Sequence, residues 1–237
     1  MNRASQAFAV AASALVVGSS ASAQSLEAYT GYVALLVGPI GGLAVTPPSG
    51  LVADAPDAPV VSVMVGKLNG SDPARTFTVG LQFELPTPLF SSVTLGVGRF
   101  IQECNCVSHA MFMVRGMKML VATREDSTTV RSFRAAVQLS GGIASVPDIP
   151  NYSAALELPV ALRFTGKSYR FAPFVTPGVG RGWVVNHDKA VHGDRAILSG
   201  GISVEDLARR VTLSAGMKRI LITGERYLYG VSVSLAP

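Results

Sequence analysis

Residues 152–164 read Tyr-Ser-Ala-Ala-Leu-Glu-Leu-Pro-Val-Ala-Leu-Arg-Phe, and this stretch decides the fold class. Every second residue from Tyr152 to Phe164 is apolar, whereas Glu157 and Arg163 lie at alternate positions. Side chains alternate between two faces only in a β-strand, so the pattern predicts a strand and not a helix. The stretch exceeds the about 5 to 6 residues usual in soluble proteins. It is long enough for the about 9 to 11 residues that a tilted strand needs to cross a bilayer.

Similar segments recur along the chain after residue 58. They are residues 59–68, 76–85, 90–101, 110–121, 131–144, 169–184, 195–204, 211–222 and 226–236. Together they predict an all-β fold, a closed antiparallel up-and-down transmembrane β-barrel of about ten strands. Counts of twelve and eight are the alternatives, because single-chain bacterial barrels have even strand numbers.

The composition agrees with apolar faces turned toward lipid. The chain is 49% hydrophobic and 15% charged, with a mean hydropathy of +0.39, whereas an average soluble domain is about 25% charged. After the N-terminal region it has no run of about 18 apolar residues that would form a spanning helix. Its basic residues are scattered, which argues against a nucleic-acid partner.

The N-terminus predicts export. Arg3, the uncharged apolar stretch 7–17 and the small residues Ala21-Ser22-Ala23 form a secretory signal peptide, cleaved near Ala23. We therefore divide the chain into a signal peptide (1–23), an N-terminal segment (24–58) and a barrel domain (59–237). Within the N-terminal segment, residues 29–45 could add a hairpin at Gly38–Gly42 or pack in or under the barrel as a plug.

The last strand carries a family resemblance. Tyr229, Val231, Val233 and Leu235 alternate with Gly230, Ser232 and Ser234. This resembles the C-terminal signal of bacterial outer-membrane β-barrel proteins, such as small OmpA-, OmpX- or OmpW-like and porin-like barrels, although the chain ends in Leu-Ala-Pro and not in an aromatic residue. The resemblance implies a Gram-negative outer-membrane location. It also implies two partners, outer-membrane lipid and the assembly machinery that reads the last strand.

Connection lengths predict an orientation. Barrels of this kind keep both termini and the short turns in the periplasm and the longer loops outside. Residues 86–88, 123–129, 165–168 and 205–210 then form periplasmic turns, whereas residues 102–109, 145–151, 186–194 and 223–225 form external loops. Aromatic residues near segment ends are candidates for the two interfacial girdles, namely Phe90, Phe100, Tyr152, Phe164, Tyr169, Trp183 and Tyr227.

Polar residues on the alternate face are expected to point into the lumen. They are Gln82, Glu84, Arg134, Gln138, Glu157, Arg163, Arg170, Thr176 and Lys218. Arg163 and Arg170 flank one tight turn and are expected to face each other across it. In a narrow barrel such groups neutralise one another as a plug, which we favour, whereas in a wider one they would line an anion-preferring pore.

Other residues give weaker candidates for chemistry. Cys104 and Cys106 could form a disulfide in an oxidising compartment, or stay an inert pair, and a metal role would need more ligands than His109. His187, Asp188, His192 and Ser199 are the candidates for a lipid hydrolase of the outer membrane, but no G-x-S-x-G motif is present. We expect no enzyme, cofactor or metal.

Two functions are therefore weighed in addition to the hydrolase. The first is a membrane barrel, structural or forming a narrow pore for small solutes. The second is a soluble periplasmic β-barrel that binds an apolar ligand, in which Leu156 and Leu158 would lie inside and Glu157 would face water. Solvent-exposed apolar faces would favour the first function.

Overall fold

The computed structural model describes residues 46–54, 59–69, 74–85, 87–102, 108–123, 131–146, 149–186, 189–221 and 227–236. The predicted signal peptide and residues 29–45 lie outside these ranges. The described elements are a short helix α4 (Ser49–Val52) and the strands β1 (Val60–Asn69), β2 (Ala74–Glu84), β3 (Ser92–Gln102), β4 (Ser108–Ala122), β5 (Arg131–Val146), β6 (Ile149–Glu157), β7 (Val160–Thr165), β8 (Tyr169–Asn186), β9 (Lys189–Asp206), β10 (Val211–Ile220) and β11 (Tyr227–Leu235). No helix within these ranges is long and apolar enough to cross a membrane.

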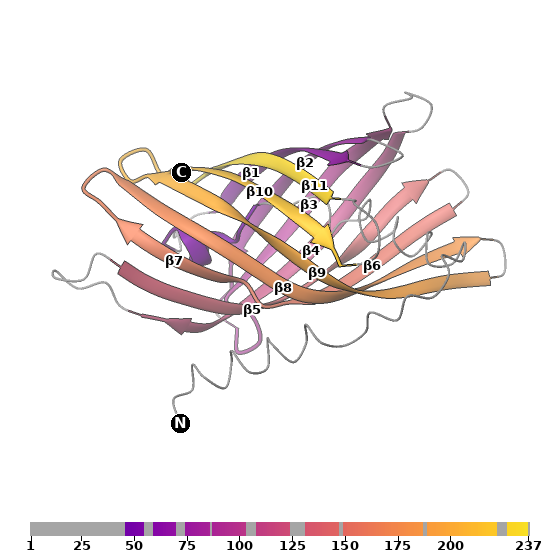
Figure 1. Ribbon diagram of the computed structural model, residues 1–237, viewed down its shortest axis with the longest axis horizontal. Helices are drawn as coiled ribbons and strands as arrows, with labels where there is room; N and C mark the ends of the chain where they lie inside the picture. Colours follow the sequence, from indigo (N-terminus) through magenta and orange to yellow (C-terminus); the bar gives the residue numbers. More distant parts are fainter. Residues whose placement is uncertain are drawn as a thin grey trace.

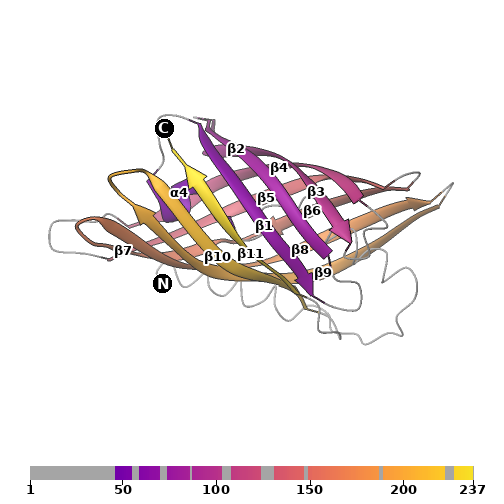
Figure 2. The same cartoon turned by 90° about the horizontal axis from the view of Figure 1, so that it is seen from above.

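The strands form one closed antiparallel sheet. Strands β1 to β5 and β8 to β11 each pair with their neighbours in the sequence, and β1 pairs with β11 over Val61↔Leu235 to Asn69↔Tyr227. The first and last strands therefore close the barrel, whose tilted strands are seen from two directions in Figures 1 and 2. Closure gives every described strand a hydrogen-bonded neighbour on each side over at least part of its length, which is what a sheet in a bilayer requires.

Strands β6 and β7 are two halves of one strand. Both lie between β5 and β8, and both keep the same register against each neighbour, as Gln138↔Glu157 and Ala135↔Val160 show. The break falls at Pro159, which has no N–H to donate to the ladder. The Pro159 carbonyl still accepts from Ala136 N at 2.9 Å. Counted in this way the barrel has ten strands, so the prediction is confirmed.

The two ends of the barrel differ. The near end holds the start of β1, the end of β11 and the turns β7–β8 and β9–β10, and the far end holds the tips of the hairpins β5–β6 and β8–β9. The external loops predicted at 145–151 and 186–194 are wrong, because pairing continues to Val146↔Ile149 and Asn186↔Lys189. These ranges lie between the segments that show the alternation of apolar side chains, but backbone pairing does not require apolar side chains.

The alternation of the strands places apolar side chains outside and polar side chains inside. Leu156 is 49% exposed, whereas its neighbour Glu157 is 3% exposed, and Arg163 is 1% exposed. This placement contradicts the soluble alternative, which put Leu156 inside and Glu157 in water. Among the predicted girdle aromatics, Tyr152 and Tyr169 are exposed, but Phe100 is wrong, because it lies on the inward parity of β3, buried against His109.

A row of glycines crosses four neighbouring strands at one level. Gly201 pairs with Gly216, Gly216 with Gly230, and Gly230 with Gly66. A Cβ on Gly201 would lie 2.1 Å from the carbonyl oxygen of Ala215, so no larger residue fits there. Glycine allows the sheet to bend and the backbones to approach closely at such a level.

Residues 46–54 lie inside this barrel. Leu51 and Val52 of α4 are buried against Met117, Ala136, Ala161, Ala172 and Phe174 from β4, β5, β7 and β8. Figure 2 shows α4 within the near end, between the strands. The hairpin or plug considered for residues 29–45 falls outside the described residues, and residues 46–54 are the described part of the N-terminal segment. We call residues 46–54 the plug.

Candidate functional site

The lumen is lined by hydroxyl and charged side chains because these residues take the inward positions of the strands. Paired inward serines bond across neighbouring strands, Ser62 to Ser234 and Ser203 to Ser214, each at 2.8 Å between hydroxyl oxygens. These bonds satisfy polar groups that would otherwise be buried without a partner. Two ionic clusters complete the interior, one in the middle and one at the near end.

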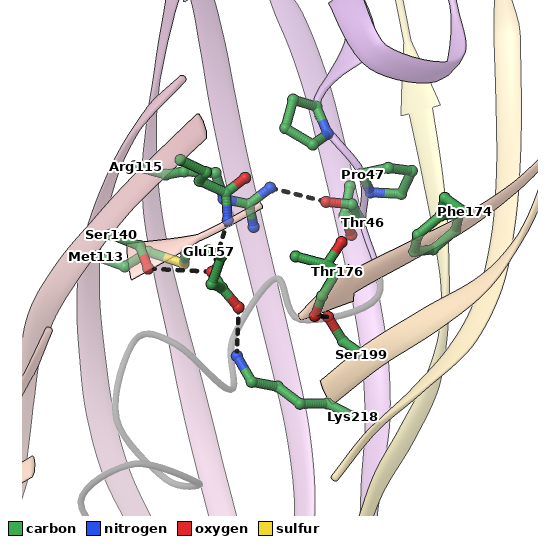
Figure 3. A pocket seen from close by; sticks show the side chains of 12 residues that line it. Thr46, Pro47, Met113, Arg115, Ser140, Glu157, Phe174, Thr176, Ser199 and Lys218 are labelled. Atoms are coloured by element: carbon green, nitrogen blue, oxygen red, sulfur yellow. Dashed lines mark hydrogen bonds and ion pairs between the residues drawn. The ribbon is translucent and has the colours of Figure 1, made fainter. Parts of the chain in front are cut away.

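The central cluster is built on Glu157 of β6. Its carboxylate accepts from Lys218 Nζ at 3.3 Å and from Gln138 Nε2 at 2.7 Å, and Ser140 Oγ lies 3.5 Å away. Figure 3 shows Lys218 and Ser140 approaching this carboxylate from two sides. Both partners of the Glu157–Lys218 pair are almost fully buried, at 4% and 2% side-chain exposure. A carboxylate so deep in the protein needs these donors, because burial of an unpaired charge is very costly.

Arg115 of β4 joins the central cluster to the plug. Its Nη1 donates to the carbonyl oxygen of Thr46 at 2.8 Å (Figure 3). Arg115, Glu157 and Lys218 line a cavity together with Thr46, Pro47 and Pro48. The cavity offers about 20 Å³ to the centres of water molecules, which is room for one or two of them. The middle of the lumen therefore contains a small cavity beside the plug.

The near-end cluster is built on Asp54, the last described residue of the plug. Its Oδ1 lies 3.0 Å from Nη2 of Arg134 and 3.0 Å from Nη2 of Arg163, and its Oδ2 lies 2.7 Å from Nη2 of Arg170. Arg170 also pairs with Glu205 of β9. Burial alone would raise the pKa of Asp54, but the guanidinium groups of Arg163 and Arg170 hold that pKa below its ordinary value.

Cationic residues border the apolar outer surface. On the far-end side, five exposed apolar residues are each followed, at the next outward position toward that end, by a cationic residue. The apolar residues are Val65, Phe77, Val97, Val179 and Met217, and the cationic residues are, in the same order, Lys67, Arg75, Arg99, Arg181 and Arg219. Arg181 pairs with Asp194 at the same level of the hairpin β8–β9. On the near-end side, Arg131 lies 5.7 Å over the ring of Phe164. The apolar band thus has a charged border at the depth where lipid headgroups would lie.

This combination of a closed sheet, an apolar outer band and a polar interior is the architecture of an outer-membrane β-barrel. No protein-family model and no curated protein matches the sequence.

Solved structures of outer-membrane barrels are similar. The crystal structure of the outer membrane enzyme PagL has 12% identity and a TM-score of 0.37, covering 74% of this chain and 98% of that one. The β domain of the Bordetella autotransporter BrkA has 9% identity and a TM-score of 0.46, covering 77% and 100%. The N-terminal β-barrel domain of Pseudomonas aeruginosa OprF has 11% identity and a TM-score of 0.31, covering 74% and 96%. Likenesses this weak transfer no activity to the chain.

The structure brings most of the lumen candidates into the two clusters. Gln138, Glu157 and Lys218 meet in the centre, and Arg134, Arg163 and Arg170 meet at Asp54. Arg163 and Arg170 do not pair directly across their turn, because Arg170 is opposite Thr165 in the register. Gln82 and Thr176 are buried on the inward face, whereas Glu84 is exposed at the near end of β2.

Sequence reasoning missed Asp54 and Arg115. Asp54 lies outside any strand, so alternation says nothing about its direction. Arg115 is on a strand with apolar residues on both faces, since Met113 and Met117 are inward and Phe112 and Val114 are outward. The charge itself was the available signal. A charged side chain in an otherwise apolar strand is costly in contact with lipid, so it is expected on the inward face, which here also carries Met113 and Met117.

The residues suggested for other chemistry have different outcomes. Ser199 faces the lumen, is buried and lies 3.5 Å from the carbonyl oxygen of Thr176, so it is not on the lipid side where the hydrolase hypothesis needed it. The disulfide candidates Cys104 and Cys106, and also His187 and Asp188, lie outside the described residues. Across the described ranges, no three His, Cys, Asp or Glu side chains are grouped so that they could hold a metal ion.

Proposed function

We propose that this protein is an outer-membrane β-barrel with a lumen closed by its own plug, acting as a lipid-embedded structural barrel and not as an open pore. The observation that carries the proposal is the inverted distribution of side chains. Apolar residues such as Leu156, Leu213 and Val231 are about half exposed, whereas Arg163 and Lys218 are almost fully buried. In water this arrangement would leave a large apolar surface exposed, but in a bilayer it is the stable one.

The charged borders support the same proposal. A protein in lipid needs cations near the headgroups and none in the middle of its outer face, and Arg75, Arg99 and Arg219 have that position. We place the near end in the periplasm, because the C-terminal end of β11 and the short turn β9–β10 lie there, and barrels of this kind keep their termini and short turns on the periplasmic side. Asp206 Oδ1 stabilises that turn by accepting from the backbone N–H groups of Ala208 and Arg209 at 3.0 and 3.1 Å.

The first experiment is fractionation of the full chain with its signal peptide in a Gram-negative host. We expect cleavage near Ala23, recovery in the outer-membrane fraction, and faster migration on unheated gels than on heated ones. Recovery as a soluble periplasmic species would contradict the proposal.

A matched pair of variants tests which surface meets lipid. Leu156→Arg places a charge in the apolar band, and Val185→Arg places the same charge outward on β8 beyond the Arg181–Asp194 pair. A charge at mid-bilayer costs about 2 to 4 kcal/mol, and much less near the interface. We expect L156R to lower the folded fraction in membranes strongly and V185R to leave it nearly unchanged, and equal effects would contradict the assigned band.

A further inference from the structure

We propose that Arg134, Arg163 and Arg170 form a binding site for a small oxyanion, and that Asp54 occupies this site as an internal ligand. The Asp54 carboxylate is then a displaceable ligand of this site. The inference rests on the proposed function only for the compartment from which the oxyanion arrives. The site itself follows from the geometry of the near-end cluster.

The three arginines are fixed parts of the barrel wall. Arg134 is on β5, Arg163 on β7 and Arg170 on β8, which are neighbours in the sheet. Their side chains are 17%, 1% and 6% exposed, so the barrel buries three positive charges within reach of one carboxylate. Guanidinium groups keep their charge at any ordinary pH, so the site requires an anion.

The anion that fills the site is a replaceable one. The side chain of Asp54 is 65% exposed although all three of its partners are mostly buried. Solvent therefore reaches the carboxylate from the open end of the barrel. Glu205 provides a second carboxylate, which pairs with Arg170, whereas the Asp54 carboxylate contacts all three arginines.

The plug is held by more than its carboxylate. Arg134 Nη1 also donates to the carbonyl oxygens of Gly50 and Ala53, at 2.6 and 3.3 Å, and Leu51 is fully buried. An incoming anion can replace only the carboxylate. We therefore expect the intact plug to exclude oxyanions at low concentration, as a tethered competitor with an effective concentration in the millimolar range would do.

The geometry indicates the chemical class of the ligand. Three guanidinium groups present N–H donors to both oxygens of one carboxylate, which suits a carboxylate or a phosphate, since these accept several charge-assisted hydrogen bonds at once. Chloride, with a single centre, satisfies fewer of these donors. The phosphate could belong to a free ion or to a lipid headgroup, and the experiment has an arm for each.

The test is chemical rescue of the full chain in non-ionic detergent micelles. The Asp54→Ala variant and the wild type are melted in chloride and in increasing inorganic phosphate at constant ionic strength. We expect phosphate to raise the melting temperature of D54A, with a midpoint at least about ten-fold lower than for the wild type. Acetate should act in the same direction. A melting temperature of D54A that is the same in phosphate and in chloride would overturn the proposal.

Two controls identify the arginines and the source of the anion. The double variant Asp54→Ala, Arg163→Met should lose the rescue, and rescue that persists would overturn the assignment. Adding phosphatidylglycerol to the micelles in place of free phosphate tests a lipid source, and stabilisation of D54A by the lipid alone would overturn a soluble ligand.

The result does not depend on where the protein resides. If D54A does not fold in chloride, the yield of the fast-migrating form on unheated gels, after refolding with and without phosphate, gives the same comparison. A chain that fails to reach the outer membrane in the fractionation experiment would contradict the proposed function. The rescue experiment in micelles would still decide whether the three arginines bind an oxyanion.

Discussion

The two ionic clusters of the lumen have the same kinds of groups but different construction. The central carboxylate, Glu157, and its cation, Lys218, are both carried by barrel strands and are almost fully buried. The near-end carboxylate, Asp54, belongs to the plug and is mostly exposed, while its arginines are fixed in the wall. The central pair is therefore part of the barrel wall, whereas we expect the near-end pairs to separate without unfolding the barrel.

The largest expected effect comes from the central cluster. Glu157→Ala leaves Lys218 buried without its partner carboxylate, and removal of one member of a buried pair costs about 3 to 5 kcal/mol. Asp54→Ala should cost less than this, because the Asp54 side chain is 65% exposed, so water and solution anions can reach the arginines that it leaves. Urea unfolding in micelles measures both.

Equal losses in the two variants would remove the distinction between the clusters. The double variant Glu157→Gln, Lys218→Met provides the control. It removes the unpaired ammonium, so it should recover part of the stability that Glu157→Ala loses.

A smaller effect on stability, but a new conductance, is expected from the plug. Leu51 is fully buried beside Met117 and Phe174, so Leu51→Asp places a carboxylate in an apolar contact and should displace α4. The opened lumen keeps Arg115, Arg134, Arg163, Arg170 and Lys218 against Glu157 and Glu205, so its conductance should prefer anions.

Planar bilayers test this comparison directly. The wild type and the matched control Leu51→Ala, which keeps the plug apolar, should both be silent. A folded Leu51→Asp barrel that is equally silent would show that residues 46–54 do not close the lumen.

The smallest expected effect is a dependence on pH. The pKa of Asp54 lies below its ordinary value of 3.8 in the folded protein, so its ion pairs contribute stability above that value and lose it as the pH falls through the folded pKa. The other carboxyl of this cluster is Glu205, which pairs with Arg170 and is present in both the wild type and the Asp54→Asn variant. The difference in melting temperature between the wild type and Asp54→Asn isolates Asp54.

This difference should be present at pH 6, should shrink as the pH falls below 3.8, and should vanish only below the lowered pKa of the folded protein, where the wild-type carboxyl becomes protonated. A difference that persists unchanged into acid would mean that Asp54 contributes through packing and not through its charge.

The sequence predicted the wall of the barrel well because each strand position is decided locally. Alternation assigned Leu156 to the outside and Glu157 to the inside, and the ten segments correspond to ten strands once β6 and β7 are counted together. The prediction failed where a residue was assigned from its place at the end of a segment and not from the face of the strand on which it lies. Phe100 was assigned to a girdle from its place at a segment end, but its parity on β3 turns it inward.

Loop predictions failed for a different reason. Residues 145–151 and 186–194 have polar compositions, but each lies opposite a partner strand that continues, as Arg181↔Asp194 shows. Pairing between backbones extends a hairpin regardless of side-chain polarity, and nothing local to either segment records how far its partner runs.

The sequence by itself determined that the chain forms long amphipathic strands with an apolar face and a polar face, because the two-residue period is a property of the strand alone. Only the tertiary structure decided which residues meet inside the barrel. Asp54 meets Arg134, Arg163 and Arg170 across 80 to 116 residues of chain. A contact of that range depends on closure of the barrel around the plug, and no local pattern encodes it.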